Sequence, residues 1–163
     1  FRGEVDKYGW VDIGSSFLPS EVVAAFLFAQ LEELDRIQKI RLSIWNYYYA
    51  HLKELENNGC LRFPSVDENA TNNGHMFYII LRSLEERAKF IRHLKDNGIL
   101  SVFHYLSLHN SLYYKDKHDG RDLNNADRFS DCLVRLPLYC ELSHNEMEHI
   151  ISKINLFFKC SSK

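Results

Sequence analysis

A helical pattern of about 38 residues without a proline constrains the fold of this chain more than any other feature. Apolar residues recur at steps of three and four after Ser20, until the triplet Asn57-Asn58-Gly59 stops the pattern. Ser20 is a suitable N-cap, and Glu21 places negative charge in the first turn. An unbroken helix of this length would span roughly 57 Å. Because such a helix is unusual in a small domain, we expect a kink or break near Asp35-Arg36.

The rest of the chain alternates strand-like and helix-like segments. Runs rich in aromatic and β-branched residues predict strands at residues 61–63, 75–82, 99–105 and 134–138. Pro137 places the last of these at the edge of a sheet or at a strand end. Helices are expected at residues 84–97, 125–132 and from 143 onward, and a polar surface loop is expected at 110–125.

Two capping boxes mark helix starts in this second part of the chain. Ser83 with Glu86, and Ser143 with Glu146, have the spacing at which each side chain bonds the backbone amide of the other residue. The fold class that follows is α+β: a long helix or kinked helix pair, then a small sheet with flanking helices.

Composition and charge narrow the class of protein and the partners to be expected. The chain has 163 residues, 45% of them hydrophobic, which is enough for one compact core. A formal net charge of −2 gives no basic footprint, so we expect neither nucleic acid nor an anionic membrane as partner. Its four cysteines form no C-x-x-C pair, a pattern that favours reduced thiols in a cytoplasmic protein. They are Cys60, Cys132, Cys140 and Cys160.

No complete catalytic constellation is visible, and no catalytic residue or metal site is assigned. His144 and His149 lie five residues apart, about 140° around a helix, so they cannot bind one metal together. His104 follows a predicted strand and His109 lies in the next loop, where each either lines a cleft or serves the fold. Ser15 and Ser16 precede a helix start and either bind an anion or only turn the chain. The aromatic cluster of Trp45, Tyr47, Tyr48 and Tyr49 is expected in a core or interface.

Several stretches, in their order and spacing, resemble the DegT/DnrJ/EryC1/StrS family of sugar-nucleotide aminotransferases, and most closely its dTDP-4-oxo-6-deoxy-D-glucose transaminase branch. The stretches are Lys7-Tyr8, Trp10-Val11-Asp12-Ile13-Gly14-Ser15-Ser16, Leu18-Pro19-Ser20, Ala24-Ala25 with Ala29-Gln30-Leu31, His75-Met76-Phe77-Tyr78, Val102-Phe103-His104-Tyr105 with Leu108-His109, and Arg135-Leu136-Pro137-Leu138. The resemblance implies a fold type I enzyme whose large domain and cofactor lysine precede Phe1. Residues 1–19 would then end the cofactor-region loop of that domain, and residues 20–163 would form the C-terminal small domain.

The resemblance also implies roles for particular residues. Ser16 occupies the position of an Asn that touches the phosphate of pyridoxal 5'-phosphate across a homodimer, with Ser15 beside it. Leu18 replaces an Arg common in the family, so no contact of that Arg carries over. Substrate-binding roles fall on His104, His109, Tyr8 and Trp10.

The implied activity is transfer of an amino group from an amino acid, with L-glutamate expected, to the 4-keto carbon of a dTDP-4-keto-6-deoxyhexose for lipopolysaccharide or antigen sugars. No lysine of the chain matches the cofactor lysine, so we expect the chain alone to be inactive. Because the large domain would be missing, we also expect apolar surface on the long helix to be covered by self-association. One alternative is a stand-alone, non-catalytic α+β binding or regulatory module. Another is a family member that uses the cofactor for dehydration, which depends on whether Lys or His stands at the cofactor position.

Overall fold

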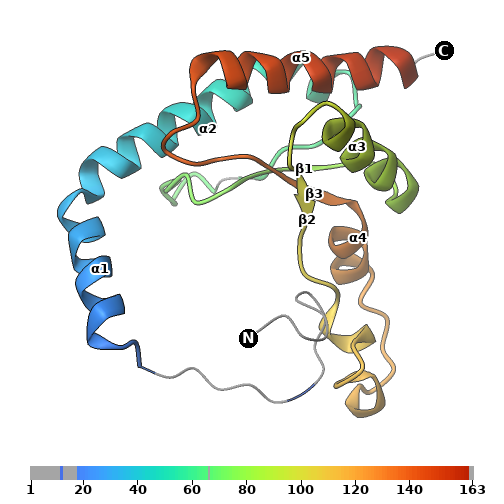
Figure 1. Ribbon diagram of the computed structural model, residues 1–163. Helices are drawn as coiled ribbons and strands as arrows, with labels where there is room; N and C mark the ends of the chain where they lie inside the picture. Colours follow the sequence, from blue (N-terminus) through green and yellow to red (C-terminus); the bar gives the residue numbers. More distant parts are fainter. Residues whose placement is uncertain (1–11, 13–17, 66, 162–163) are drawn as a thin grey trace.

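The long helical pattern forms two helices that meet at a sharp bend (Figure 1). The computed structural model describes residues 12, 18–65 and 67–161, apart from the side chains of residues 160 and 161. Helix α1 comprises Glu21–Glu32 and α2 comprises Leu34–Asn57. Glu33, with φ −99° and ψ 11°, leaves the helical conformation between them. The expected break is therefore confirmed, slightly earlier than Asp35-Arg36.

A small antiparallel sheet follows, with strand order β1-β3-β2. Its strands are β1 (Phe77–Ile80), β2 (Val102–Phe103) and β3 (Leu133–Leu136). β3 is the central strand, so an edge position is wrong. The strand-end alternative is confirmed, because Pro137 directly follows Leu136, the last paired residue.

All four predicted strands were longer than the observed ones, and the expected strand at 75–82 pairs only over Phe77–Ile80. The expected strand at 61–63 is reduced to one bridge, in which Arg62 and Ile80 exchange two backbone hydrogen bonds of 2.9 Å. The expected strand at 99–105 pairs only at Val102 and Phe103. Strand length depends on the partner that the rest of the chain supplies, which the local sequence does not specify.

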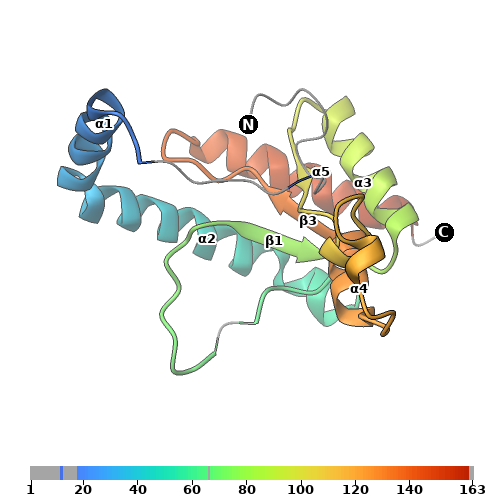
Figure 2. The same cartoon turned by 90° about the horizontal axis from the view of Figure 1, so that it is seen from below.

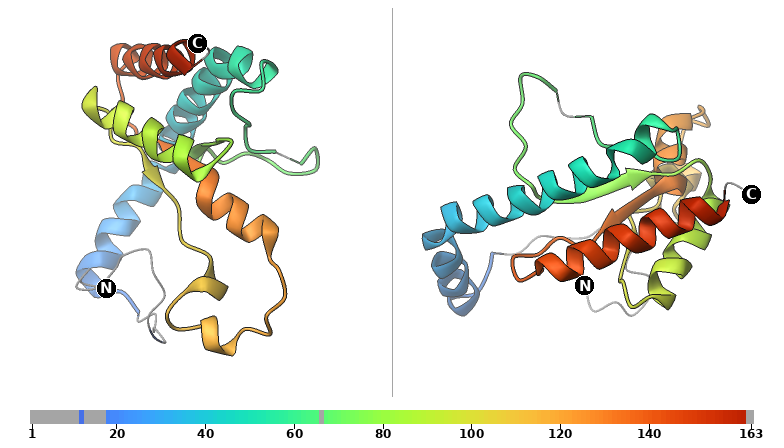
Figure 3. Two further views of the ribbon diagram at one scale, coloured as in Figure 1. Left: turned by 90° about the vertical axis from the view of Figure 1, so that its right-hand side faces the viewer. Right: turned by 90° about the horizontal axis from the view of Figure 1, so that it is seen from above.

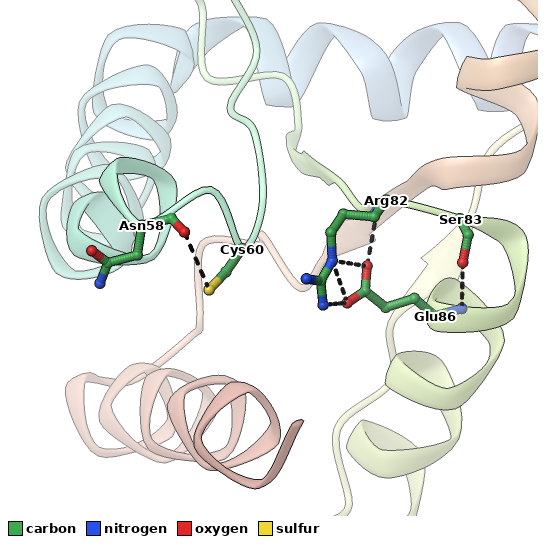
Figure 4. A network of polar contacts seen from close by, with 5 residues as sticks. All are labelled: Asn58, Cys60, Arg82, Ser83 and Glu86. Carbon is green, nitrogen blue, oxygen red and sulfur yellow. Dashed lines mark hydrogen bonds and ion pairs between the residues drawn. The ribbon is translucent and has the colours of Figure 1, made fainter. Parts of the chain in front are cut away.

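Three further helices begin near the predicted positions: α3 (Leu84–Asp96), α4 (Asn124–Cys132) and α5 (His144–Ser161). The Ser143 box forms as expected, since the Glu146 carboxylate accepts from the Ser143 amide at 2.8 Å. The first box is displaced by one residue: Ser83 Oγ accepts from the Glu86 amide at 3.1 Å, but the Glu86 carboxylate accepts from the amide of Arg82 at 2.8 Å (Figure 4). The Arg82 guanidinium pairs with the same carboxylate.

One face of the sheet packs against α2, α3 and α5, and these elements supply a single hydrophobic core (Figure 3). The predicted aromatic cluster contributes to it: Trp45 and Tyr48 are buried, whereas Tyr49 stacks on Trp45 nearer the surface. The fully buried members with the largest side chains are Tyr48, Phe77, Phe90, Leu52, Leu61, Ile79, Leu94, Ile154 and Val134.

Helix α1 lies apart from this core (Figure 2). It has no buried residue, and Val22, Phe26 and Phe28 are among its exposed large apolar side chains. Within the described ranges, no helix is long and apolar enough to cross a membrane.

The expected surface loop between β2 and α4 contains two short 3₁₀ turns, η1 (Leu108–Asn110) and η2 (Lys115–Lys117).

Candidate functional site

The face of the sheet opposite the core carries a lone arginine on its central strand. Arg135 pairs directly with Tyr78 on β1 and with Val102 on β2, so these three residues share one face. The next residue on each side along β3, Val134 and Leu136, is buried in the core. Alternation along β3 therefore directs Arg135 away from the core.

Most hydrogen-bond donors of the Arg135 guanidinium have no partner within the described part of the chain. Its Nε is buried and has no hydrogen-bond partner there, and one of its Nη atoms donates only a long 3.5 Å bond to the Phe103 carbonyl. A guanidinium has five N–H donors, so most of its capacity for hydrogen bonding is unused.

A second arginine brings His75 to the same region. Arg41 on α2 donates from Nε to the Gly74 carbonyl at 3.1 Å, from one Nη to the Leu138 carbonyl at 3.4 Å, and from the other to the His75 carbonyl. These bonds tie the segment before β1 and the segment after β3 to one helix. Gly74 fits beneath this clamp because it has φ +59° and no side chain.

The clamped segments and the sheet line an open pocket of about 260 Å³. It is lined by His75, Met76, Leu100, Val102, Arg135, Leu136, Pro137 and Leu138. The lining is mostly apolar, with one permanent cation and one histidine, and this composition suits a small anion with an aliphatic body.

His104 lies close to these two groups, one residue beyond β2. Burial lowers the pKa of His104, and the Arg135 guanidinium and, after it, the neighbouring His75 ring lower it further. Its Nδ1 is buried and unpartnered among the described residues. The neutral imidazole therefore prevails near neutral pH.

His109 belongs to a different group, around the first 3₁₀ turn. Its Nε2 lies 3.0 and 3.2 Å from the two carboxylate oxygens of Asp127 on α4. The same carboxylate accepts from Ser107 Oγ at 2.9 Å and from Asn110 Nδ2 at 2.8 Å. These bonds to the ionised form lower the pKa of Asp127, that from Ser107 most and that from His109 next.

This network borders a second, more polar pocket of about 360 Å³. His109 and His118 lie there with ring centroids 5.2 Å apart, beside Lys117, Asp119 and Arg121. Two carboxylates face these groups: Asp119 pairs with Arg121 at 3.5 Å, and Asp127 contacts His109.

The six predicted site residues thus fall into three sets. Ser15, Ser16, Tyr8 and Trp10 lie outside the described residues. The other two do not form one site with each other: His104 lies beside Arg135 and His109 beside Asp127.

Sequence reasoning did not single out Arg135 or His75 as site residues, although both stand in stretches that carry the family resemblance. The sequence signal that could have pointed to Arg135 is a charged residue between apolar neighbours in a predicted strand. Across the described residues, no group of histidines, cysteines and carboxylates has the arrangement of a metal site. His144 and His149 have separate partners, Glu148 and the Asn97 carbonyl.

The curated proteins similar to this chain include two that are named as transaminases of dTDP-linked sugars. The chain is 24% identical over 156 residues to the dTDP-3-amino-3,6-dideoxy-alpha-D-galactopyranose transaminase of Aneurinibacillus thermoaerophilus, covering 95% of this chain and 41% of the relative. It is 28% identical over 157 residues to the dTDP-4-amino-4,6-dideoxy-D-glucose transaminase of Shigella dysenteriae, covering 91% of this chain and 42% of the relative. The chain therefore spans about two fifths of the length of these relatives.

Solved structures share the fold. The aminotransferase TlmJ from Streptoalloteichus hindustanus matches with a TM-score of 0.78 at 22% identity, over 90% of this chain and 38% of that one. A Bacillus subtilis protein, NtdA, solved with bound PMP as cofactor, matches with a TM-score of 0.65 at 24% identity, over 76% of this chain and 28% of that one. The model of the DegT/DnrJ/EryC1/StrS aminotransferase family matches residues 2–155, and the chain belongs to that family.

Proposed function

We propose that this chain is the C-terminal part of a pyridoxal-phosphate-dependent transaminase acting on a dTDP-4-keto-6-deoxyhexose, with L-glutamate as amino donor. Residues 1–19 end the cofactor-region loop of the large domain, and residues 20–163 form the small domain. The family match over residues 2–155 is the observation that carries the proposal. Two of the curated relatives are named as transaminases of dTDP-linked sugars, which supports a sugar nucleotide as substrate.

The position of the amino group is assigned from the relatives' names. One relative is named for a 3-amino sugar and the other for a 4-amino sugar. We choose the 4-keto carbon because the 4-amino relative has the higher identity, 28% against 24%. A role in lipopolysaccharide or antigen sugar synthesis and a cytoplasmic location are the further expectations that accompany this choice.

The residues of this chain bind the cofactor phosphate and the sugar nucleotide. Pyridoxal phosphate supplies the electron sink through which an amino group is taken up and passed on. Ser15 and Ser16 donate to its phosphate, an assignment that the observed start of α1 at Glu21 supports, since the positive end of a helix favours an anion. His104, His109, Tyr8 and Trp10 contact the sugar nucleotide. A second subunit completes the site in a homodimer.

The decisive experiment uses the protein encoded together with its upstream sequence. Pyridoxal phosphate is added, the protein is reduced with borohydride, and the modified lysine is located by peptide mass. A tagged lysine shortly before Phe1 supports the transaminase. No tag favours the stand-alone binding module, and a histidine at the corresponding position favours the dehydrating variant.

Two substrates then distinguish the carbon that is aminated. The longer protein is incubated with L-glutamate and either a 4-keto or a 3-keto dTDP-6-deoxyhexose, and 2-oxoglutarate release is measured. We expect release with the 4-keto sugar only. The 163-residue chain alone is expected to release none, and release from it would contradict the assignment of the cofactor lysine to an upstream domain.

A further inference from the structure

The imidazole ring of His109 is held through one of its two nitrogens. Its Nε2 lies 3.0 and 3.2 Å from the two carboxylate oxygens of Asp127, whereas no hydrogen bond joins its Nδ1 to a described residue. An ionised carboxylate only accepts hydrogen bonds, so it selects a ring that carries a proton on Nε2. In the neutral ring, Nδ1 is then the acceptor.

Asp127 is kept in the ionised form that this selection requires. Its carboxylate accepts from Ser107 Oγ at 2.9 Å and from Asn110 Nδ2 at 2.8 Å. It also lies in the first turn of α4, where the positive end of the helix favours negative charge. The bond from Ser107 is foremost in lowering the pKa of Asp127, so the carboxylate is charged at neutral pH.

The same contacts fix the position of the ring beside the polar pocket of about 360 Å³ that it lines. The His109 side chain is only 10% exposed, and its ring packs beside that of His118. The other carboxylate lining this pocket, that of Asp119, pairs with Arg121 and lies 3.7 Å from His118. Asp127 is therefore the carboxylate that orients His109 before any ligand arrives, which reduces the entropy lost on binding.

We propose that Asp127 is a positioning residue for His109: it holds the ring with its proton on Nε2, so that Nδ1 accepts a hydrogen bond from a hydroxyl group of the bound sugar nucleotide. A hydroxyl fits this nitrogen because it donates a proton, whereas an ionised phosphate has none to donate. The sugar nucleotide as ligand rests on the proposed function. The pairing of Asp127 with Nε2 rests on the contacts alone.

The state of the ring is tested on the 163-residue chain, which contains both residues. Long-range proton–nitrogen NMR spectra of the isotope-labelled chain distinguish a protonated from an unprotonated ring nitrogen. At a pH where the ring is neutral, we expect the proton of His109 on Nε2. Asp127→Asn presents an amide N–H donor to Nε2, so it should move the proton to Nδ1.

Asp131→Asn is the matched control, because it makes the same change at an exposed residue one turn further along α4. It should leave the proton on Nε2, as in the parent chain.

The contact with the substrate is tested in the longer protein, encoded with its upstream sequence. Asp127→Asn should raise KM for the keto sugar about tenfold, the effect of one lost hydrogen bond of ordinary strength. The half-reaction with L-glutamate, which does not involve the sugar, should be unchanged, and so should both steps in Asp131→Asn. In a His109→Ala background, Asp127→Asn should have no further effect, because the carboxylate acts through the ring.

Inhibition by dTDP then locates the hydroxyl group. Weaker inhibition of Asp127→Asn than of the parent enzyme assigns the hydroxyl to the nucleoside, and equal inhibition assigns it to the hexose.

A parent ring with its proton on Nδ1, or a proton position that Asp127→Asn does not change, would overturn the proposal. An unchanged KM despite an altered ring would overturn the contact with the substrate. Lysine tagging does not depend on Asp127, and the NMR measurement does not depend on the cofactor. A failure here is therefore distinguishable from a failure of the transaminase proposal.

Discussion

Tyr48 combines full burial with one specific polar contact, and this makes it a sensitive residue in the core. Its side chain is inaccessible, and its hydroxyl donates to the Pro137 carbonyl at 2.9 Å. Burial raises the pKa of this phenol, so it stays protonated and remains a donor. Tyr48→Phe should lower the free energy of unfolding by about 1–2 kcal/mol, as expected for a lost bond to a partly buried acceptor.

Tyr49→Phe is the matched control for urea denaturation of this variant. The Tyr49 hydroxyl accepts only a 3.4 Å bond from Lys53 and lies nearer the surface. The control should stay within about 0.5 kcal/mol of the parent chain. Equal effects of the two substitutions would show that the bond to Pro137 contributes nothing specific.

The carboxyl of Asp127 gives a second test at this scale. The Ser107 hydroxyl is the largest cause of its lowered pKa, and Asn110 contributes less. Ser107→Ala should therefore raise the Asp127 pKa more than Asn110→Ala does, as followed by carboxyl NMR. A group with a lowered folded-state pKa stabilises the fold above its unfolded pKa, and this stabilisation is lost as pH falls through the folded value. The stability difference between Ser107→Ala and the parent should accordingly vanish in acid, and a difference that grows in acid would contradict this assignment.

Among the elements, the turn before β1 depends on Gly74. A Cβ at this position would lie 3.1 Å from the Arg41 carbonyl carbon and 3.2 Å from the Leu42 amide nitrogen, both backbone atoms that cannot move aside easily. Its φ of +59° adds strain of about 1–2 kcal/mol for any other residue. Gly74→Ala should thus reduce the free energy of unfolding by more than this strain alone.

Gly59→Ala separates strain from crowding in the same thermal or urea melts. Gly59 has a similar φ of +70°, but a Cβ added there would meet nothing within 4 Å. Gly59→Ala should therefore lose only the stability that corresponds to the strained backbone conformation. If both alanine variants lose the same stability, the close approach of α2 to Gly74 is not a constraint.

The elements also show what the sequence could and could not predict. Helix starts were accurate because caps and the 3.6-residue period are local, as at Ser20, Ser83 and Ser143. Strand pairing was not predicted, because β3 becomes central only when β1 and β2, distant in sequence, pair with it. For the same reason the sequence suggested His104 and His109 but did not reveal that Arg135 and Asp127 would stand beside them. Those neighbours come from β3 and α4, whose placement depends on the whole fold.

At the scale of the whole molecule, α1 is the element least accounted for by the described contacts. Val22 is 80% exposed and Phe26 71% exposed, on a helix with no buried residue. Contiguous apolar surface of this kind is uncommon on a monomer and marks an interaction surface. We expect α1 of a second copy to cover it in solutions of this chain, so light scattering should give an average mass that rises with concentration. The double substitution Val22→Lys with Phe26→Lys should reduce association, whereas Leu84→Lys, at a separate apolar residue that is 48% exposed on α3, should not. A constant monomer mass at all concentrations would show that α1 needs no cover from another copy.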